Sequence, residues 1–204
     1  MKKNTLWSVA AGVGLLLGGQ AVLAAPDTTE GQKKFYTCAG CHGIQGYSNA
    51  FPTYAVPKLG GQYAEYVVAA LKAYQSGGRK HGSMEGNSAG WTDADFQSIA
   101  AYIAKFRSIN ENNPISGNVA AGKSKAENCG ACHGEDGNSQ DPNNPRLAGQ
   151  YESYLVKALQ DYKSGVRKNP IMNGMAGSLS EDDIKDISAF YASQKKGLTV
   201  VSED

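Results

Sequence analysis

Apolar residues recur with a helical period in two segments of this chain, and the two segments resemble each other. In each segment the apolar positions are three or four residues apart, which places them on one face of a helix. They are Tyr63, Tyr66, Val67, Ala70 and Tyr74 in the first segment and Tyr151, Tyr154, Leu155, Ala158 and Tyr162 in the second. Both segments stop at a Ser-Gly pair, a common helix end. The pattern therefore predicts an amphipathic helix in each half, beginning near Gln62 and Gln150.

A second pair of helices is predicted to begin at Thr92 and Ser180. Each hydroxyl can accept from free backbone N–H groups, and the acidic residues that follow suit the positive end of a helix dipole. The apolar faces that follow are Phe96, Ile99, Ile103 and Phe106 in the first half and Ile184, Ile187 and Tyr191 in the second. Shorter helices are predicted over residues 28–37 and 116–128. Because no segment shows a convincing strand pattern, the predicted fold class is all-α.

The two halves are related by an internal duplication. Residues from Pro57 to Met84 align without a gap with residues from Pro145 to Met172, at a constant offset of 88 residues (145 − 57). Such long self-similarity indicates a repeated domain, and the polar, proline and glycine residues between the repeats are typical of a linker. We expect a first domain, a linker and a second domain over residues 25–110, 111–117 and 118–204.

The first 24 residues have the pattern of a secretory signal peptide. Two lysines precede an apolar run, and small residues end the segment at Ala24. The run is too short and too rich in glycine for a confident membrane span, so we expect cleavage after Ala24; an uncleaved anchor is the alternative. The whole chain has 20 basic and 19 acidic residues and no basic stripe, so a nucleic-acid partner is not expected.

All four cysteines fall in two C-x-x-C-H units, Cys38–His42 and Cys129–His133. This motif predicts covalent haem c at each unit, with thioethers to Cys38 and Cys41 or to Cys129 and Cys132, and with the histidine as an iron ligand. A thioredoxin-like pair or a zinc site with two thiolates and one histidine is the alternative, and the adjacent histidine in both units favours haem. Two haem c groups in an exported chain indicate the periplasm.

The repeat also selects candidates for the sixth ligand of each iron. Beyond the signal peptide, the methionines are Met84, Met172 and Met175. Met84 and Met172 occupy equivalent repeat positions in loops rich in glycine, serine and asparagine, whereas the position equivalent to Met175 is Asn87. We predict that Met84 and Met172 bind the two irons, with Met175 as the competitor of Met172. Filling a gap in the core is the alternative role for these side chains.

Three more polar residues lie just before these methionines. The position equivalent to His81 is Asn169, so His81 is expected to be an exposed loop residue and not a ligand. Arg79 and Arg167 are equivalent to each other. A guanidinium suits bidentate contact with a carboxylate, so the two arginines are candidates for contact with the haem propionates. A solvated loop charge is the alternative for both.

These motifs carry a family resemblance. The two C-x-x-C-H units, the P-x-L-x-G-Q-Y segments from Pro57 and Pro145 and the late methionines resemble the dihaem class I cytochromes c, most closely the cytochrome c₄ family. The resemblance implies two tandem class I cytochrome c domains about a pseudo-two-fold axis, with neighbouring haems and His/Met ligation. It also implies a periplasmic carrier, soluble or loosely membrane-associated, that passes electrons from a bc-type complex or a dehydrogenase to a terminal oxidase.

The predicted ligation favours an electron carrier and not an enzyme. An iron with histidine on one side and sulfur on the other has no open position for a substrate, which leaves one-electron transfer. One alternative is the electron-transfer subunit of a periplasmic dehydrogenase. The other is a dihaem enzyme such as a thiosulfate dehydrogenase or a peroxidase, which needs an open or unusual iron. The chain has no further cysteine to supply unusual ligation.

Overall fold

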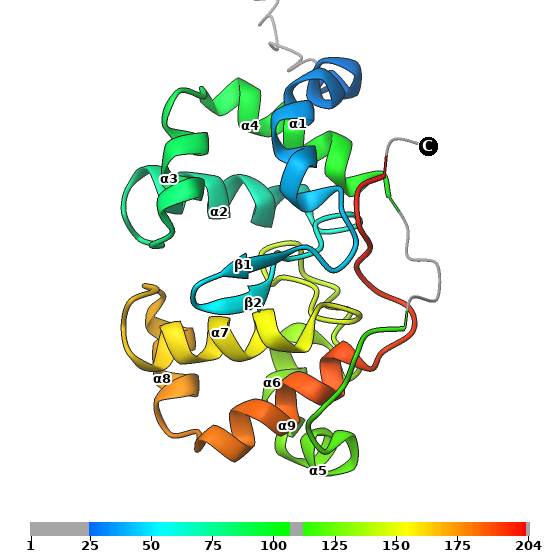
Figure 1. Ribbon diagram of the computed structural model, residues 1–204, viewed down its shortest axis with the longest axis vertical. Coiled ribbons are helices and arrows are strands. Elements are labelled where there is room, and N and C mark those ends of the chain that lie inside the picture. The colour runs from blue at the N-terminus through cyan, green and yellow to red at the C-terminus, as the bar shows by residue number, and fades with distance from the viewer. Residues whose placement is uncertain (1–24, 107–111, 203–204) are drawn as a thin grey trace, which may run out of the picture.

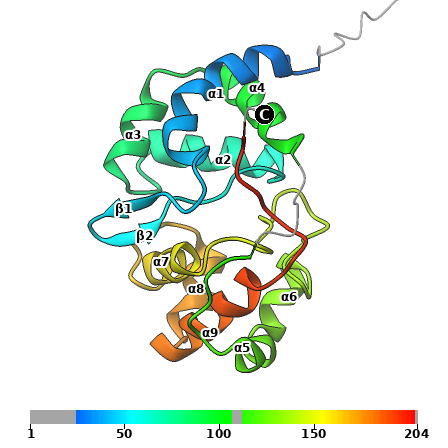
Figure 2. The same ribbon diagram turned by 45° about the vertical axis from the view of Figure 1, so that its right-hand side comes forward.

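Helices dominate both halves of the chain in a computed structural model that describes residues 25–106 and 112–202. The helices of the first half form one group and those of the second half form another group beneath it (Figure 1). A small hairpin lies between the two groups in both views (Figures 1 and 2). The helical fold class is confirmed. The predicted signal peptide, residues 1–24, lies outside the described residues.

The elements follow the same order in the two halves, apart from the hairpin and a break in the first helix of the second half. Those of the first half are α1 (Thr28–His42), β1 (Ser48–Ala50), β2 (Thr53–Ala55), α2 (Ala64–Gln75), α3 (Gly82–Ala89) and α4 (Asp93–Ala104). Those of the second half are α5 (Val119–Lys125), α6 (Glu127–His133), α7 (Glu152–Lys163), α8 (Pro170–Gly177) and α9 (Glu181–Ala192).

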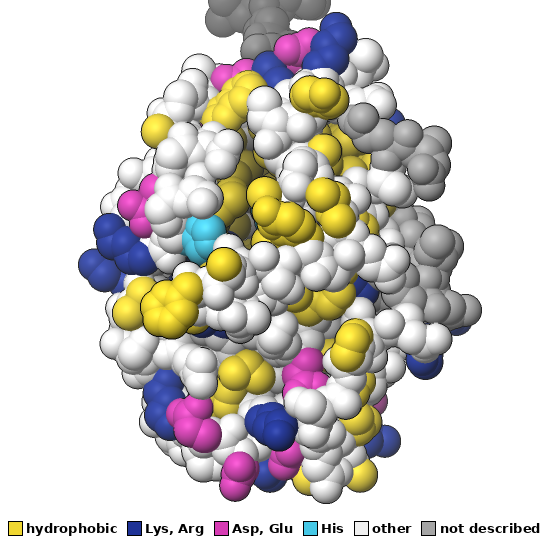
Figure 3. Space-filling model, viewed as in Figure 1, with side chains coloured by type: hydrophobic (Ala, Val, Ile, Leu, Met, Phe, Trp, Pro, Cys, Tyr) yellow, Lys and Arg dark blue, Asp and Glu magenta, His cyan; other side chains and the backbone are white. Residues whose placement is uncertain are grey.

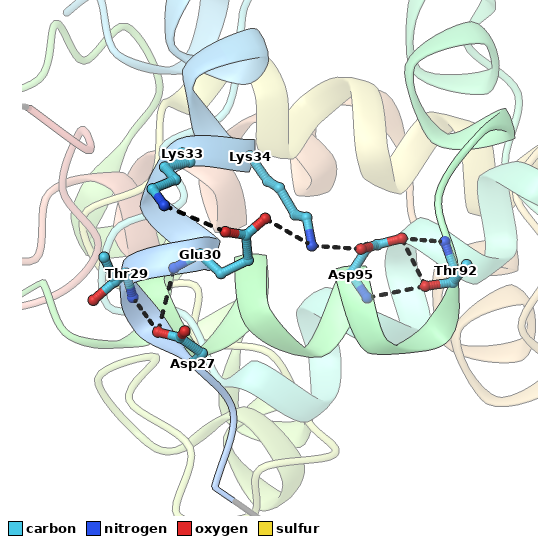
Figure 4. Close-up of polar contacts among 7 residues, drawn as sticks. All are labelled: Asp27, Thr29, Glu30, Lys33, Lys34, Thr92 and Asp95. Carbon is cyan, nitrogen blue, oxygen red and sulfur yellow. Dashed lines mark hydrogen bonds and ion pairs between the residues drawn. The ribbon is translucent and has the colours of Figure 1, made fainter.

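The predicted start of the last helix in each half is confirmed. The Thr92 hydroxyl accepts a hydrogen bond from the backbone N–H of Asp95 at 3.3 Å, and the Asp95 carboxylate accepts from the backbone N–H of Thr92 at 2.8 Å (Figure 4). Asp95 also pairs with Lys34 of α1 at 2.6 Å. Hydrogen bonds from Lys34 and Thr92 hold the pKa of the Asp95 carboxyl well below its usual range. Ser180 begins α9 with the same reciprocal bonds. Each last helix is thus capped, and in both halves the capping carboxylate also binds the first helix, since Asp183 pairs with Lys125 of α5 at 2.9 Å.

The first helix of each half extends further than predicted. α1 continues past residue 37 to His42, and α6 continues past residue 128 to His133, so both haem motifs are helical. The residues between the cysteines are alanine and glycine, which show no periodic pattern of apolar side chains, and glycine disfavours helix. The helices predicted from the sequence therefore end too early. Packing of the first cysteine of each motif, Cys38 or Cys129, against the core of its half stabilises these turns instead.

Close helix crossings depend on two equivalent glycines. A Cβ atom on Gly31 of α1 would lie 2.0 Å from the Ser98 carbonyl oxygen of α4, and one on Gly122 of α5 would lie 1.9 Å from the Asp186 carbonyl oxygen of α9. Each glycine stands seven residues before the first cysteine of its motif (38 − 31 and 129 − 122). The same close crossing of the first and last helices therefore precedes the haem motif in each half.

The expectation that the chain contains no strand is wrong at one place. β1 and β2 form an antiparallel hairpin in which Ser48 pairs with Ala55 and Ala50 pairs with Thr53. Three-residue strands are too short to show an alternating pattern in the sequence. The backbone N–H of Ala55 donates to the Ser153 hydroxyl of α7 at 3.0 Å, so a contact from the other half stabilises the hairpin.

The interface between the halves has pseudo-two-fold symmetry. The side chain of Gln62 accepts from the backbone N–H of Arg146 and donates to its carbonyl, both at 3.0 Å. The side chain of Gln150 makes the same two bonds with Lys58, both at 2.9 Å. Lys58 and Arg146 are equivalent residues of the repeat, and so are Gln62 and Gln150, because each pair is 88 residues apart (146 − 58 and 150 − 62). The two sets of hydrogen bonds are therefore related by the repeat, as expected for a self-complementary interface.

The C-terminal segment of the second half crosses to the first half. Thr199 and Gly60 exchange two backbone hydrogen bonds of 2.9 and 3.0 Å, and Val201 is buried in the core that contains Phe35 and Ile103. Figure 1 shows this segment, coloured red, running from α9 towards the first group of helices. Among the helices of residues 25–106 and 112–202, none is both long enough and apolar enough to cross a membrane.

Candidate haem sites

The two cysteine pairs lie on the helical turns that end in the predicted histidine ligands. Cys38 and Cys41 are in α1, and Cys129 and Cys132 are in α6. In each pair the first thiol is partly buried against the core of its half and the second is exposed. A spacing of three residues places both thiols on one helix face, as two attachment points on one planar group require. All four thiols are free for such bonds.

The two histidines are buried and oriented alike. The Nδ1 atom of His42 donates to the Pro57 carbonyl at 2.8 Å, and that of His133 donates to the Pro145 carbonyl at 2.9 Å. With the proton on Nδ1, each ring presents the lone pair of Nε2 to a metal. Burial lowers the pKa of both imidazoles and so favours the neutral form that a metal ligand needs. The arrangement fits one axial ligand for each haem iron.

Two prolines have a role that was not predicted from the sequence. Pro57 and Pro145 each open a repeat segment, and their carbonyls hold the histidine rings in one tautomer and orientation. A proline at the same place in both repeats is the signal that could have identified them. Which carbonyl accepts the hydrogen bond, however, depends on how the chain folds back towards the histidine, and the local sequence does not reveal this.

The zinc alternative finds no support in the geometry. Across the described parts of the chain, His, Cys, Asp and Glu side chains form no group of three or more that could hold a metal ion. Nδ1 of each motif histidine is bound to a proline carbonyl and is therefore not free to bind a metal ion. Each motif therefore suits a haem group better than a bare ion.

The two candidate methionines lie in short helices and not in loops as predicted. Met84 is in the first turn of α3, where its backbone N–H donates to Nδ1 of His81 at 3.4 Å. Met172 is in the first turn of α8, where its backbone N–H donates to the Asn169 side chain at 3.0 Å. Both thioethers are partly buried, whereas Met175 is 40% exposed. Residues rich in glycine, serine and asparagine favour loops, so capping and packing decide these helices.

His81 is not the exposed loop residue that was expected. Its ring is partly buried, caps α3 and lies edge-on to the ring of Tyr54, with the ring centroids 6.4 Å apart. Asn169 performs the same capping in the second half, so the two positions share a structural role despite their different residues.

The two arginines are buried, so the solvated-charge alternative is wrong. Arg79 is 9% exposed and Arg167 is 8% exposed. Each guanidinium lies over a tyrosine ring of its own half, Arg79 at 4.6 Å from the centroid of Tyr74 and Arg167 at 4.4 Å from that of Tyr162. Such stacking suits a guanidinium and holds its position.

Each arginine also reaches into the other half. Arg79 donates to the Tyr154 hydroxyl at 3.0 Å, and Arg167 donates to the Tyr66 hydroxyl at 2.7 Å. Burial alone raises the pKa of a phenol, but the charges of Arg167 and Arg79 outweigh burial and lower the pKa of Tyr66. The interface is therefore a positively charged, largely buried region that would stabilise an anionic group.

The stretch of chain that contains the first pair of thiols is uncharged and exposes several apolar side chains. Residues 35–57 contain no Asp, Glu, Lys or Arg, and this stretch exposes Ile44, Tyr47 and Phe51, the last being 96% exposed at the hairpin turn. The corresponding stretch of the second half, residues 126–145, contains Glu127, Glu135, Asp136 and Asp141. In Figure 3 apolar side chains gather near the middle of the face shown, and several charged side chains gather below them. The two halves thus differ in charge beside their haem motifs.

A family model for cytochrome c matches residues 28–107 and 119–195. Cytochrome c₄ of Pseudomonas aeruginosa is 54% identical over 82 residues, which cover 40% of this chain and 41% of that protein. Cytochrome c-552 of Acidithiobacillus ferridurans is 31% identical over 197 residues, which cover 88% and 84%. A thiosulfate dehydrogenase electron acceptor of Stutzerimonas stutzeri is 29% identical over 214 residues, which cover 93% and 95%.

The fold is similar to a solved cytochrome c₄ of Acidithiobacillus ferrooxidans, with a TM-score of 0.68 and 28% identity over 78% of this chain and 99% of that one. The match to the Pseudomonas aeruginosa cytochrome c₄ spans only about two fifths of that protein. Together with two motifs of free thiols in two matching domains, these similarities show two covalently bound haem c groups, at Cys38 and Cys41 and at Cys129 and Cys132.

Proposed function

Since this chain belongs to the cytochrome c family, and within it to the cytochromes c₄, we propose that it is a dihaem carrier of single electrons and not an enzyme. The observation that carries the proposal is the equal orientation of His42 and His133 by two proline carbonyls. Two sites built alike, each with a candidate methionine ligand at the equivalent repeat position, suit electron exchange at both and substrate chemistry at neither.

The haem groups supply reversible one-electron chemistry, and the protein supplies ligands and surroundings. His42 and His133 would hold the irons through Nε2, and we propose that the sulfur atoms of Met84 and Met172 would bind them as well. A neutral thioether favours the ferrous state, and burial of the histidines limits access of water. The protein thereby raises the potential and closes both irons to substrates.

Arg79 and Arg167 are proposed to bind haem propionates. Their hydrogen bonds within the described residues go to phenol hydroxyls, which do not neutralise a buried positive charge. A buried charge is costly unless an opposite charge accompanies it, and the propionates would provide one. The position of both arginines between the halves would then link each haem to the opposite domain.

Replacing Arg167 with glutamine is expected to lower the midpoint potential of one haem by several tens of millivolts, because loss of a nearby positive charge favours the ferric state. The potential should also become pH-dependent near neutrality, since a propionate without its cation takes up a proton more readily. Potentiometric titration at several pH values measures both effects.

Lys168→Gln is the matched control, since it removes one positive charge from the neighbouring side chain, which is exposed. An unchanged potential with no pH dependence in R167Q would mean that the arginine only joins the two halves.

The proposed function is tested by redox titration of the exported holoprotein, followed by visible absorption. We expect two one-electron transitions at positive potential and, for both ferric haems, the weak far-red band of sulfur ligation. Carbon monoxide should not bind without denaturant, because neither iron has an open position. A missing band, or a low-potential haem that binds carbon monoxide, would instead indicate an enzyme with an open iron.

For the redox partners we propose a bc-type complex or a dehydrogenase as donor and a terminal oxidase as acceptor. The similarity to a thiosulfate dehydrogenase electron acceptor over 93% of the chain favours a second candidate, the electron-transfer subunit of a periplasmic dehydrogenase. Co-purification with a dehydrogenase subunit would distinguish the second candidate from the first. We place the protein in the periplasm, soluble or loosely membrane-associated, on the basis of the predicted signal peptide.

A further inference from the structure

The helix that carries Met84 is capped by reciprocal hydrogen bonds. Nδ1 of His81 accepts from the backbone N–H of Met84 at 3.4 Å, and the Glu85 carboxylate accepts from the backbone N–H of His81 at 2.9 Å. These bonds satisfy backbone donors at the start of a helix of only eight residues. The position of the Met84 backbone therefore depends on His81.

The helix that carries Met172 uses the same arrangement with different residues. Asn169 accepts from the backbone N–H of Met172 at 3.0 Å, and Asn173 accepts from the backbone N–H of Asn169 at 2.8 Å. The Asn173 amide also donates to the carbonyls of Tyr162 and Arg167, both in the second half. This methionine segment is therefore anchored within its own domain.

His81 forms an additional link that the second half lacks at this position. Its Nε2 lies 3.3 Å from the side-chain oxygen of Asn49 in β1. Because Nδ1 accepts from Met84, the proton of the neutral ring is on Nε2, which can donate to Asn49. Asn169, the equivalent residue, has a shorter side chain that reaches only the helix it caps. One histidine therefore connects the Met84 helix to the hairpin.

The hairpin in turn contacts the second half. Asn49 donates to the Tyr54 carbonyl across the hairpin at 3.3 Å, and Ala55 donates to the Ser153 hydroxyl of α7 at 3.0 Å. The hairpin lies between the two groups of helices (Figures 1 and 2). A continuous set of contacts thus leads from Met84 to the interface.

We propose that His81 is a positioning residue for the sixth ligand of the first haem, acting through Asn49 of the hairpin. It holds the Met84 helix against an element that also binds the second domain, so ligation at the first haem depends on the interface. Ligation at the second haem depends on Asn169 and Asn173 of its own domain. The inference rests on the proposed binding of iron by Met84.

The test compares His81→Asn with the wild-type holoprotein. Asparagine keeps a cap of the kind that the second half uses, but it does not reach Asn49. Cyanide binding to the ferric protein, followed with the far-red band, reports how often the methionine leaves the iron. We expect roughly three- to tenfold faster binding at one haem, the change expected for loss of one hydrogen bond, and no change at the other. Asn49→Ala should give the same change, and the double variant should add little.

Asn87→Ala is the matched control, because it removes an exposed side-chain hydrogen bond from the same helix. The affected haem is identified by repeating the measurement in a Met172→His background. Wild-type cyanide rates in H81N and N49A, or equal acceleration at both haems, would overturn the positioning role alone. Absence of the far-red band at the first haem of the wild-type protein would overturn Met84 ligation and, with it, this inference.

Discussion

Met172→His is expected to lower the midpoint potential of one haem by a few hundred millivolts, part of the roughly 0.8 V range that axial ligands span. Imidazole stabilises ferric iron better than a thioether does, so the substituted haem becomes harder to reduce. The other haem should keep its potential, because its proposed ligands, His42 and Met84, belong to the other domain. Potentiometric titration followed by visible absorption resolves the two transitions, and the far-red band should lose about half of its intensity.

Met175→Leu is the control for the choice of ligand. Met175 lies on the same helix and is 40% exposed, so its replacement should leave both potentials unchanged. If M175L shifts a potential and M172H does not, Met175 is the ligand. If Met172→His shifts both potentials equally, the two haems are not independent sites.

Gly31→Ala is expected to destabilise the first half by about 3 kcal/mol, at the upper end of the usual cost of overpacking. The added methyl group would lie 2.0 Å from the Ser98 carbonyl oxygen and 2.6 Å from its carbon, so α1 and α4 must separate. Denaturant unfolding of the holoprotein, followed by the haem absorption and by circular dichroism, measures the loss. Gly122→Ala should have a similar effect on the second half, where the equivalent distance is 1.9 Å.

Gly40→Ala separates the steric effect from helix propensity. Gly40 lies on the same helix, and a Cβ there meets no atom within 4 Å. The equivalent residue of the second half is Ala131. We expect G40A to be neutral or to stabilise by up to about 1 kcal/mol, because alanine favours helix. Equal losses from G31A and G40A would mean that the close crossing is not what constrains Gly31.

Local patterns were sufficient for several parts of the fold. The C-x-x-C-H units and the repeat offset identify two equivalent haem domains without any knowledge of the fold. Thr92 and Ser180 begin their helices as predicted, because a cap involves only residues three positions apart. The amphipathic period likewise located α2 and α7, which end at Gln75 and Lys163 and are followed by the C-cap residues Ser76 and Ser164.

Contacts between distant residues decided the rest. The hairpin is completed by Ser153, which is 98 residues from its partner Ala55, and Arg79 binds Tyr154 across the interface. Neither partner can be inferred from the residues around it. The same is true of His81, which the sequence alone describes as a loop residue and the structure describes as a cap.

The sequence by itself determined the chemistry of this protein: the attachment of two haems, the duplication and the helical class. These features are encoded by residues that lie close together in the chain, where spacing alone specifies geometry. Only the tertiary structure decided how the two halves meet, which charges are buried and what holds each methionine segment. Those properties depend on which surfaces of the two halves are buried against each other and removed from water. This burial is determined only when both halves have folded against each other.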